Sequence, residues 1–576
     1  PMARDNGSMD VSLTFLGAVG AVTGSEFLIA TDSARVLVDA GLFQGLKALR
    51  RRNWDPLGVP ATSVDAVVVS HAHLDHCGYL PALVRQGFKG PILMTADTAA
   101  LAEIVLRDSA KLQMEDAKYA SSRGYSKHRS PKPLYNADDV ERTLPLIRIV
   151  EFDTPEAVAD RILVRLPPAG HILGSTSPVL SVEQVTIAFS GDLGRRNHPL
   201  LKPAPPPPAA SAIVVESTYG DRVHPPHPED ALAQAISRTA ERGGSVVIPA
   251  FAVDRTELLL LALQDLTRAG RIPRLPIFVD SPMALRGLSV YQSAVSQGHG
   301  DLRPDLPTDI LAGADLHEAH SATQSEALND PAQPSIIISA SGMATGGRVL
   351  HHLKAMLPDP RHSVLLVGYQ AVGTRGRDLA DGATQVKIHG EYIPVRAEVV
   401  DVQGFSVHAD ADELLGWLGS APEPPQVVYV VHGEPAASAE LTRRIGAELE
   451  RDPDLRELGL TSAMTGLVDS IGKGGDFGAA LDRAIGDAMQ AATKLAQKEI
   501  AADPDLQELG IADQLGKLVA QLGDSDELQR GAMALGKQAL QSAIGEARCE
   551  LADDPDLKAL GIAGDLDRLL VDLGDL

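Results

Sequence analysis

Four potential metal ligands occur within six residues of the chain, in the segment His71-Ala72-His73-Leu74-Asp75-His76. The segment follows an apolar run, residues 66–69, which is typical of a buried strand. His71 and His73 are two residues apart, so in an extended backbone both side chains project the same way and can share one ion. Asp75 and His76 lie past the bend and can reach a second ion. Imidazole and carboxylate groups suit zinc, and two neighbouring ions suit the hydrolysis of phosphate esters or amides.

Three more candidate ligands stand at similar places further along the chain. Asp39 ends the apolar run of residues 36–38, and Asp192 follows the strand-like run of residues 185–189. His171 lies in a turn that is flanked by Gly170 and Gly174. Loops that follow strands are rigid enough to hold ligands and open enough to admit a substrate. The sequence therefore predicts a metal site built from several strand ends.

The order of these residues resembles the metallo-β-lactamase superfamily. Residues 214–222, with Glu216, resemble motif A of its β-CASP branch. Residues 404–410, with His408, resemble motif B, and residues 430–434, with His432, resemble motif C. The resemblance extends in order over residues 11 to 447. It points to bacterial and archaeal ribonucleases that are similar to the endonuclease subunit of the cleavage and polyadenylation specificity factor.

The resemblance implies an α/β fold class. We expect an αββα metallo-β-lactamase sandwich formed by residues 11–208 and 396–447, with an inserted α/β β-CASP domain over residues 209–395. A proline-rich stretch, residues 203–208, is expected to lead into the insert. The periodicity predicts helices over residues 97–120, 229–241 and 254–269 and parallel strands in the insert at 212–215, 245–248, 335–338 and 363–367.

The resemblance also implies the role of each site residue. His71, His73 and His171 would hold one Zn²⁺, and Asp75, His76 and His432 the other, with Asp192 bridging the two ions. A hydroxide held between the ions would attack the phosphorus. Asp39 would orient a ligand histidine, Asp75 would accept the proton of the attacking water, and His408, oriented by Glu216, would act as general acid toward the leaving 3′ oxygen.

Glycine-rich loops of the insert carry the predicted substrate contacts, because exposed amides and guanidinium groups suit phosphate oxygens. These residues are Ser341, Gly342, Arg348, Arg375 and Arg377. Any one of the arginines can equally hold the interface between domains.

The implied activity is that of a zinc-dependent ribonuclease in RNA processing or decay. A histidine at motif C, here His432, goes with RNA-processing members of the family, so single-stranded RNA is the expected partner. The alternatives are a DNA nuclease of the same fold and a catalytically weak scaffold in a processing complex.

The net charge of the 576-residue chain is −24, which is unusual for a protein that binds a polyanion. Residues 452–576 carry 24 acidic and 11 basic residues, and so account for about half of the excess. Two cysteines indicate a reducing compartment, and we expect a cytoplasmic protein. No apolar stretch approaches the roughly 18 residues of a membrane span.

The C-terminal part contains a tandem repeat. The sequence Asp-Pro-Asp-Leu begins at residues 452, 503 and 554, and glycines keep the same 51-residue period. An all-α region over residues 448–576 is expected, which would dock on a protein partner or form a homo-oligomer. Residues 1–10 are expected to be a remnant of expression. Four histidines outside the motifs, His224, His227, His351 and His352, are expected to be surface residues.

Overall fold

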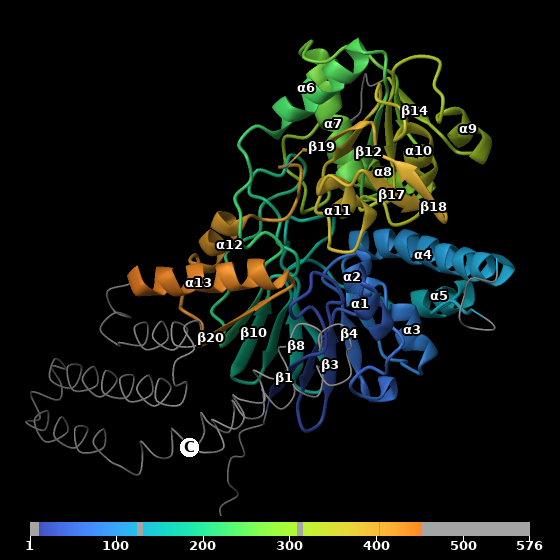
Figure 1. Cartoon of the computed structure of the whole chain (residues 1–576). Helices are drawn as coiled ribbons and strands as arrows, with labels where there is room; N and C mark the ends of the chain where they lie inside the picture. Colours follow the sequence, from blue (N-terminus) through green and yellow to red (C-terminus); the bar gives the residue numbers. More distant parts are fainter. Residues whose placement is uncertain (1–10, 124–130, 308–314, 403, 452–576) are drawn as a thin grey trace, which may run out of the picture. The chain divides into compact units, whose positions relative to one another are not determined.

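The structure is a computed structural model, and it describes residues 11–123, 131–307, 315–402 and 404–451 (Figure 1). Two compact units divide the chain, Pro1–Leu441 and Thr442–Leu576. All the strands within the described residues belong to the first unit, and helix α13 (Pro435–Arg451) crosses the boundary. The predicted remnant at residues 1–10 and the 51-residue repeats lie outside the described residues.

Two six-stranded sheets form the body of the first unit. In the first sheet the strands follow one another in chain order. The first three strands are antiparallel to one another, and the third to the sixth are parallel. Its strands are β1 (Ser12–Phe15), β2 (Phe27–Ala30), β3 (Arg35–Val38), β4 (Ala66–Val68), β5 (Ile92–Met94) and β6 (Ile147–Ile149).

The second sheet has the order β20-β11-β10-β9-β8-β7. Strands β20, β11 and β10 are parallel, and the rest of the sheet is antiparallel. Its strands are β7 (Glu156–Ala159), β8 (Ile162–Arg165), β9 (Val179–Val182), β10 (Val185–Phe189), β11 (Ala212–Glu216) and β20 (Val427–Val431).

Side chains that alternate in direction along the strands contribute to two hydrophobic cores. Val36 and Val38 of β3 pack against apolar side chains of the second sheet, such as Val164 and Leu180. Leu37, between them, faces the opposite way and joins the core under the helices. Successive side chains of a strand point to opposite faces, so one apolar strand can serve both cores.

Helices cover the outer face of the first sheet. The 28-residue helix α4 packs against α5 and against α8 (Pro282–Gln297) of the insert, and α3 packs against α5. The helix predicted over residues 97–120 is confirmed as α4. The helical segments of this part are α1 (Lys47–Arg52), η1 (Ala61–Ser63), α2 (Leu74–Cys77), α3 (Leu80–Arg85), α4 (Ala96–Arg123), α5 (Ala137–Thr143) and η2 (Leu144–Leu146).

The insert contains a parallel sheet of its own, in the order β14-β13-β15-β12-β16-β19. Its strands are β12 (Val246–Pro249), β13 (Ile277–Val279), β14 (Leu316–Glu318), β15 (Ile336–Ser339), β16 (Ser363–Leu366) and β19 (Glu398–Asp401). A separate hairpin is formed by β17 (Gln385–Ile388) and β18 (Glu391–Pro394). The predicted strands near residues 245, 335 and 363 are confirmed.

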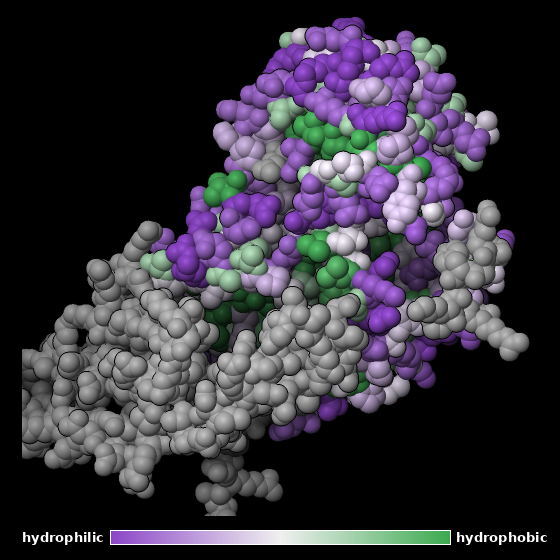
Figure 2. All heavy atoms as spheres, viewed as in Figure 1, coloured by the Kyte–Doolittle hydropathy of each residue, from purple (hydrophilic) through white to green (hydrophobic). Residues whose placement is uncertain are grey.

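Helices flank this sheet, and the insert presents a largely hydrophilic surface on the face shown in Figure 2. The helices are α6 (Pro228–Glu241), α7 (Arg255–Arg268), α8 (Pro282–Gln297), α9 (Ala322–Ala327), α10 (Val349–Met356) and α11 (Arg375–Ala380); α12 (Ala411–Leu418) follows on the return to the first domain. Within the described ranges, none of the helices has both the length and the apolar composition needed to cross a lipid bilayer.

Two predicted boundaries of the insert are wrong. Strand β11 was assigned to the insert but pairs with β10 and β20 in the second sheet. Strand β19, at Glu398–Asp401, was assigned to the sandwich but pairs with β16 in the sheet of the insert. Strand β11 is buried along its whole length, and a parallel strand that is apolar on both faces does not show by its sequence which sheet it joins. Strand β19 is partly exposed, and its place in the sheet depends on its pairing with β16, which is distant in the sequence.

Candidate active site

The candidate site lies where five strand ends meet. Asp39 follows β3, His71 follows β4, Asp192 follows β10, Glu216 ends β11 and His432 follows β20. Strands β3 and β4 run parallel in one sheet, and β10, β11 and β20 run parallel in the other. The carboxyl ends of parallel strands lie at one edge of a sheet, and this brings residues far apart in sequence together.

Four ligand atoms of the first predicted zinc set converge. His71 Nε2 lies 3.0 Å from His73 Nδ1, and His171 Nε2 lies 3.3 Å from the same atom. Asp192 Oδ2 lies 3.4 Å from His71 Nε2 and 3.5 Å from His171 Nε2. Two ligands that each lie about 2.0–2.1 Å from a tetrahedral zinc ion are about 3.4 Å apart, so these spacings fit one shared ion.

The second set also converges, on the other oxygen of the same aspartate. His76 Nε2 lies 3.2 Å from Asp192 Oδ1 and 3.1 Å from His432 Nε2. His432 Nε2 lies 3.6 Å from Asp75 Oδ2. Asp192 thus presents one carboxylate oxygen to each set, which is the arrangement that a bridging ligand requires. The donor set of imidazoles and carboxylates fits divalent metal ions such as zinc.

Burial keeps three of the histidines neutral. It lowers the pKa of His71 to about 3 and that of His73 to about 4, and it lowers the pKa of His171 well below its usual value. A neutral imidazole has a free lone pair, which metal binding requires. Burial alone would raise the pKa of Asp192, but the surrounding histidines, His432 first, hold it well below its usual value and keep the bridging carboxylate charged.

Asp39 and Ser70 position His76, a candidate ligand of the second set, through the ring nitrogen that faces away from the metal position. Asp39 Oδ2 lies 2.8 Å from His76 Nδ1, so the opposite ring nitrogen faces the metal position. The Ser70 amide donates to Asp39 Oδ1 at 2.7 Å, and the Ser70 hydroxyl donates to Asp39 Oδ2 at 2.9 Å. This geometry supports the prediction that Asp39 orients a ligand histidine, here His76. Ser70 was missed, because a serine beside a ligand carries no signal of its own.

Motif A supports motif C. Thr218 Oγ1 lies 3.1 Å from His432 Nδ1, and the Ser217 amide donates to the His432 carbonyl at 3.3 Å. The His432 amide donates to the Ala18 carbonyl at 2.8 Å. His432 adopts φ 51°, in the left-handed region, and the two backbone contacts, with Ser217 and Ala18, hold it there.

The insert holds the loop that carries His171. The Leu173 amide donates to Tyr291 Oη at 2.9 Å, and the Gly174 amide donates to Asp301 Oδ2 at 2.7 Å. Tyr291 belongs to α8 of the insert, and its hydroxyl donates to Asp254 at 2.7 Å. The loop of the candidate ligand His171 is therefore positioned partly by the inserted domain, which its sequence motif did not indicate.

His408 and Glu216 form a pair beside the metal ligands. His408 Nδ1 lies 3.1 Å from Glu216 Oε2, and Glu216 also accepts a hydrogen bond from the Leu193 amide at 2.6 Å. Burial opposes protonation of His408, but the charges of Glu216 and Asp192 raise its pKa above the usual value. With Nδ1 held by Glu216, Nε2 is the ring nitrogen left to meet a substrate.

A cavity of about 610 Å³ opens at this centre. One wall consists of sandwich residues, including His73, Asp75 and residues of α4, and another of loops of the insert. Ser341 and Gly342, two predicted substrate residues, line it. So do Arg348 and His408. Predicted metal ligands, the predicted general acid His408 and the predicted substrate loop of the insert thus line one cavity.

The predicted arginines make contacts within the protein. Arg348 donates to Asp280 Oδ1 at 2.6 Å and to the Ala319 carbonyl at 2.9 Å. Arg375 donates to the Lys387 carbonyl at 2.6 Å. Their assignment as substrate ligands stays a prediction, and the contacts present are those of residues that hold loops together.

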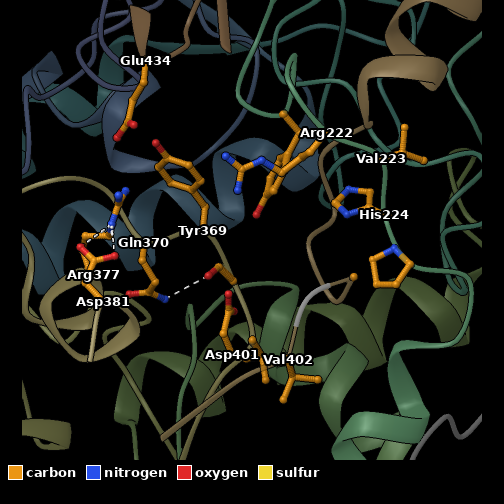
Figure 3. Close-up of a pocket in the computed structure, with 15 residues that line it drawn as sticks. Arg222, Val223, His224, Tyr369, Gln370, Arg377, Asp381, Asp401, Val402 and Glu434 are labelled. Atoms are coloured by element: carbon orange, nitrogen blue, oxygen red, sulfur yellow. Dashed lines mark hydrogen bonds and ion pairs between the residues drawn. The ribbon is translucent and has the colours of Figure 1, made fainter. Parts of the chain in front are cut away.

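Arg377 lies at a second, smaller pocket of about 240 Å³, whose walls include Arg222, Tyr369 and Glu434 (Figure 3). Its guanidinium is paired with Asp381 at 2.9 Å. Arg222 is paired with Asp221 at 2.8 Å. With both arginines neutralised and acidic side chains in the wall, this pocket does not offer free positive charge to a phosphate.

Two of the four histidines predicted at the surface are buried. His352 is fully buried, and its Nε2 lies 2.7 Å from Asp280 Oδ2. His224 is 9% exposed, and its Nε2 lies 3.0 Å from the His408 carbonyl. Consecutive helical residues point about 100° apart, so His351 can be exposed while His352 faces the core. His224 is covered because its proline-rich loop packs against motif B.

Comparison with known proteins agrees with this geometry. A family model described as the metallo-β-lactamase superfamily matches residues 19–247, one described as the Beta-Casp domain matches residues 256–379, and one described as a Zn-dependent metallo-hydrolase RNA specificity domain matches residues 392–453. A curated relative, Ribonuclease TTHA0252 of Thermus thermophilus, is 39% identical over 431 residues, which cover 73% of this chain and 92% of that protein.

The chain belongs to the β-CASP branch of the metallo-β-lactamase superfamily. An RNase J-like protein of Methanocaldococcus jannaschii is 32% identical over 74% of this chain and 93% of its own length. Transcription termination factor FttA of Methanosarcina mazei is 30% identical over 76% of this chain and 69% of its own length. Membership of this β-CASP family makes the protein a metal-dependent hydrolase, and the predicted resemblance is confirmed.

Proposed function

We propose that this protein is a zinc-dependent ribonuclease that hydrolyses phosphodiester bonds of single-stranded RNA, with two Zn²⁺ per chain. The observation that carries the proposal is the convergence of two ligand sets on opposite oxygens of Asp192, beside a His408–Glu216 pair at one cavity. The names of the relatives, which are ribonucleases and a transcription termination factor, support RNA as the substrate class. So does His432 at motif C.

The ions, when bound, would activate water and neutralise charge that develops on the phosphate. The protein's own residues would do the rest. Glu216 holds His408 by Nδ1 and favours its protonated form, so Nε2 can give a proton to the leaving 3′ oxygen. Asp75 would be the proton acceptor: burial alone would raise the pKa of its carboxyl, but hydrogen bonding to His432 lowers it below its usual value, so the group is present as the carboxylate. Ser341 and Gly342 would face the phosphate backbone from the insert.

A gel assay with end-labelled single-stranded RNA and a matched DNA tests the proposal. Zinc-loaded wild type is compared with His408→Ala and with chelated protein. We expect cleavage of RNA in the wild type and its loss in both controls, and the pattern of products separates internal from terminal attack. Preferential cleavage of DNA would favour the DNA-nuclease alternative. Absence of cleavage by zinc-replete protein would favour the scaffold alternative.

A further inference from the structure

Arg255 is a buried cation without a partner. It is the first residue of α7, it is 4% exposed, and it lines the cavity at the metal ligands. Its Nε and Nη1 atoms have no hydrogen-bond partner, and within the part of the chain that the structure describes it forms no ion pair. Buried charges in proteins are normally paired, so this guanidinium needs an explanation.

Neighbouring acids do not neutralise it. Asp254 is already engaged, by His198 Nε2 at 3.2 Å and by the Tyr291 hydroxyl at 2.7 Å. Glu257 lies two residues further along α7, and helix residues so spaced do not face one another. Burial raises the pKa of Glu257 well above its usual value, so its carboxyl is held neutral. Burial lowers the pKa of Arg255, the charge of Asp254 offsets this only in part, and the charge of Arg195 lowers it further.

The surroundings of Arg255 connect it to the metal side of the cavity. Phe251 lies four residues before it, ahead of the start of α7, and the Phe251 ring centre lies 6.3 Å from that of His73. Glycines make room for this pair: a Cβ on Gly342 would meet the Phe251 ring at 2.6 Å, and one on Gly368 would lie 3.7 Å from Arg255 Nε. Gly368 therefore lies beside both Phe251 and Arg255, and the predicted substrate residue Gly342 lies beside the same Phe251 ring.

We propose that Arg255 binds a phosphate of the RNA strand that occupies the cavity. This inference rests on the proposed function, which supplies the anion. A guanidinium offers planar, paired N–H donors that match phosphate oxygens, and an anion at this place would compensate a charge that the protein leaves uncompensated. Arg348 and Arg375 differ, because their guanidiniums already donate to oxygens of the protein.

Equilibrium binding of a short, fluorescein-labelled single-stranded RNA is the test. The full chain is zinc-loaded and carries His408→Ala in every sample, so that the RNA stays intact. We expect Arg255→Met to weaken binding roughly 10- to 100-fold, the range for a charge-assisted hydrogen bond. The slope of log affinity against log salt should fall by about 0.7, the value for one phosphate contact on a single strand. Arg255→Lys should retain the slope.

Arg271→Met is the matched control, because Arg271 is an exposed arginine of the same domain that is paired with Asp230. It should leave both affinity and salt slope unchanged. The reference protein carries only His408→Ala. If this reference and the Arg271→Met control bind RNA, but Arg255→Met binds equally well, the inference fails and the proposed function stands. If the reference protein binds no single-stranded RNA, the proposed function fails and the inference falls with it.

Thermal unfolding without RNA separates binding from a structural role. Removing an uncompensated buried charge should leave the melting temperature of Arg255→Met equal to that of the wild type or raise it. A lowered melting temperature together with an unchanged salt slope would overturn the proposal, because it would mean that Arg255 holds the fold. Addition of RNA should raise the melting temperature of the reference protein more than that of Arg255→Met.

Discussion

At the scale of single residues, the candidate ligand side chains can be selected from the sequence because metal chemistry restricts them, and the structure brings them together. Only a few residue types bind divalent ions, and their spacing around His71 and His73 is too specific for a surface loop. The residues that the sequence did not reveal act through the backbone or through burial. Ser70 and Thr218 are common residue types, and nothing in the sequence around Arg255 shows that its charge has no partner.

His73→Ala tests the metal site itself. His73 Nδ1 is close to both other imidazoles of the first set, so its loss leaves that set with two imidazoles and a carboxylate. We expect zinc content, measured by atomic emission on dialysed protein, to fall from about two ions per chain to about one, since a tetrahedral site needs four ligands. RNA cleavage should be lost. An exposed histidine of the insert, His320→Ala, is the control. Unchanged zinc content in His73→Ala would contradict the ligand assignment.

Glu26, which is not itself a candidate ligand, provides a pH-dependent prediction. Burial raises the pKa of Glu26 from 4.5 to about 8, and the charge of Arg52 offsets this only in part. Between these values the folded protein keeps a proton that the unfolded chain releases, so stability falls as pH rises through this window. Glu26→Gln removes the effect. One pKa unit corresponds to about 1.4 kcal/mol, so the variant should be more stable than wild type at pH 8 by a few times this amount.

At about pH 4 the two proteins should be equally stable, because Glu26 is then protonated in both states. Urea unfolding of chelated samples at both pH values makes the measurement independent of zinc binding. Glu151→Gln, at an exposed position, is the control and should show no such difference. Equal stabilisation by Glu26→Gln at both pH values would show that the carboxyl is not the cause.

At the scale of elements, strands and helices were easier to predict than their partners. Helix α4 and the strands near residues 245, 335 and 363 follow from local periodicity. Strand β11 was placed in the wrong sheet, because register and partner depend on residues far along the chain. The same limit applies to α8, whose position against the His171 loop depends on tertiary packing that no local pattern encodes.

The contact between α8 and the His171 loop gives a prediction at this scale. Tyr291→Phe removes the acceptor of the Leu173 amide and a donor to Asp254, and both groups are buried. A buried polar group left without its partner costs about 1–3 kcal/mol, and we expect the free energy of unfolding to fall by this amount. Urea denaturation of the zinc-loaded protein measures it. Tyr392→Phe, at an exposed tyrosine of the insert, should have no effect. An unchanged stability of Tyr291→Phe would show that this contact does not couple the domains.

At the scale of the whole molecule, charge and catalysis lie in different parts of the chain. The strongly acidic residues 452–576 lie beyond the predicted RNA-contacting motifs, and every described ligand and cavity residue precedes residue 442. An acidic segment disfavours binding of a polyanion through charge repulsion, and salt at 0.1 M screens this repulsion between exposed charges that are more than about 10 Å apart. The same net charge can therefore coexist with a site that binds RNA.

Removal of residues 452–576 tests this separation. The shortened chain keeps α13 and all seven proposed ligands, so we expect unchanged zinc content and retained cleavage of short RNA. Its RNA affinity should equal that of the full chain at high salt and exceed it at low salt, because a net charge of −13 has been removed. Binding titrations at two ionic strengths measure the difference, and light scattering of both chains shows whether the repeats mediate oligomer formation. Loss of cleavage by a folded, zinc-replete short chain would mean that the repeats complete the active site, and an affinity difference that persists at high salt would mean that they contact the RNA.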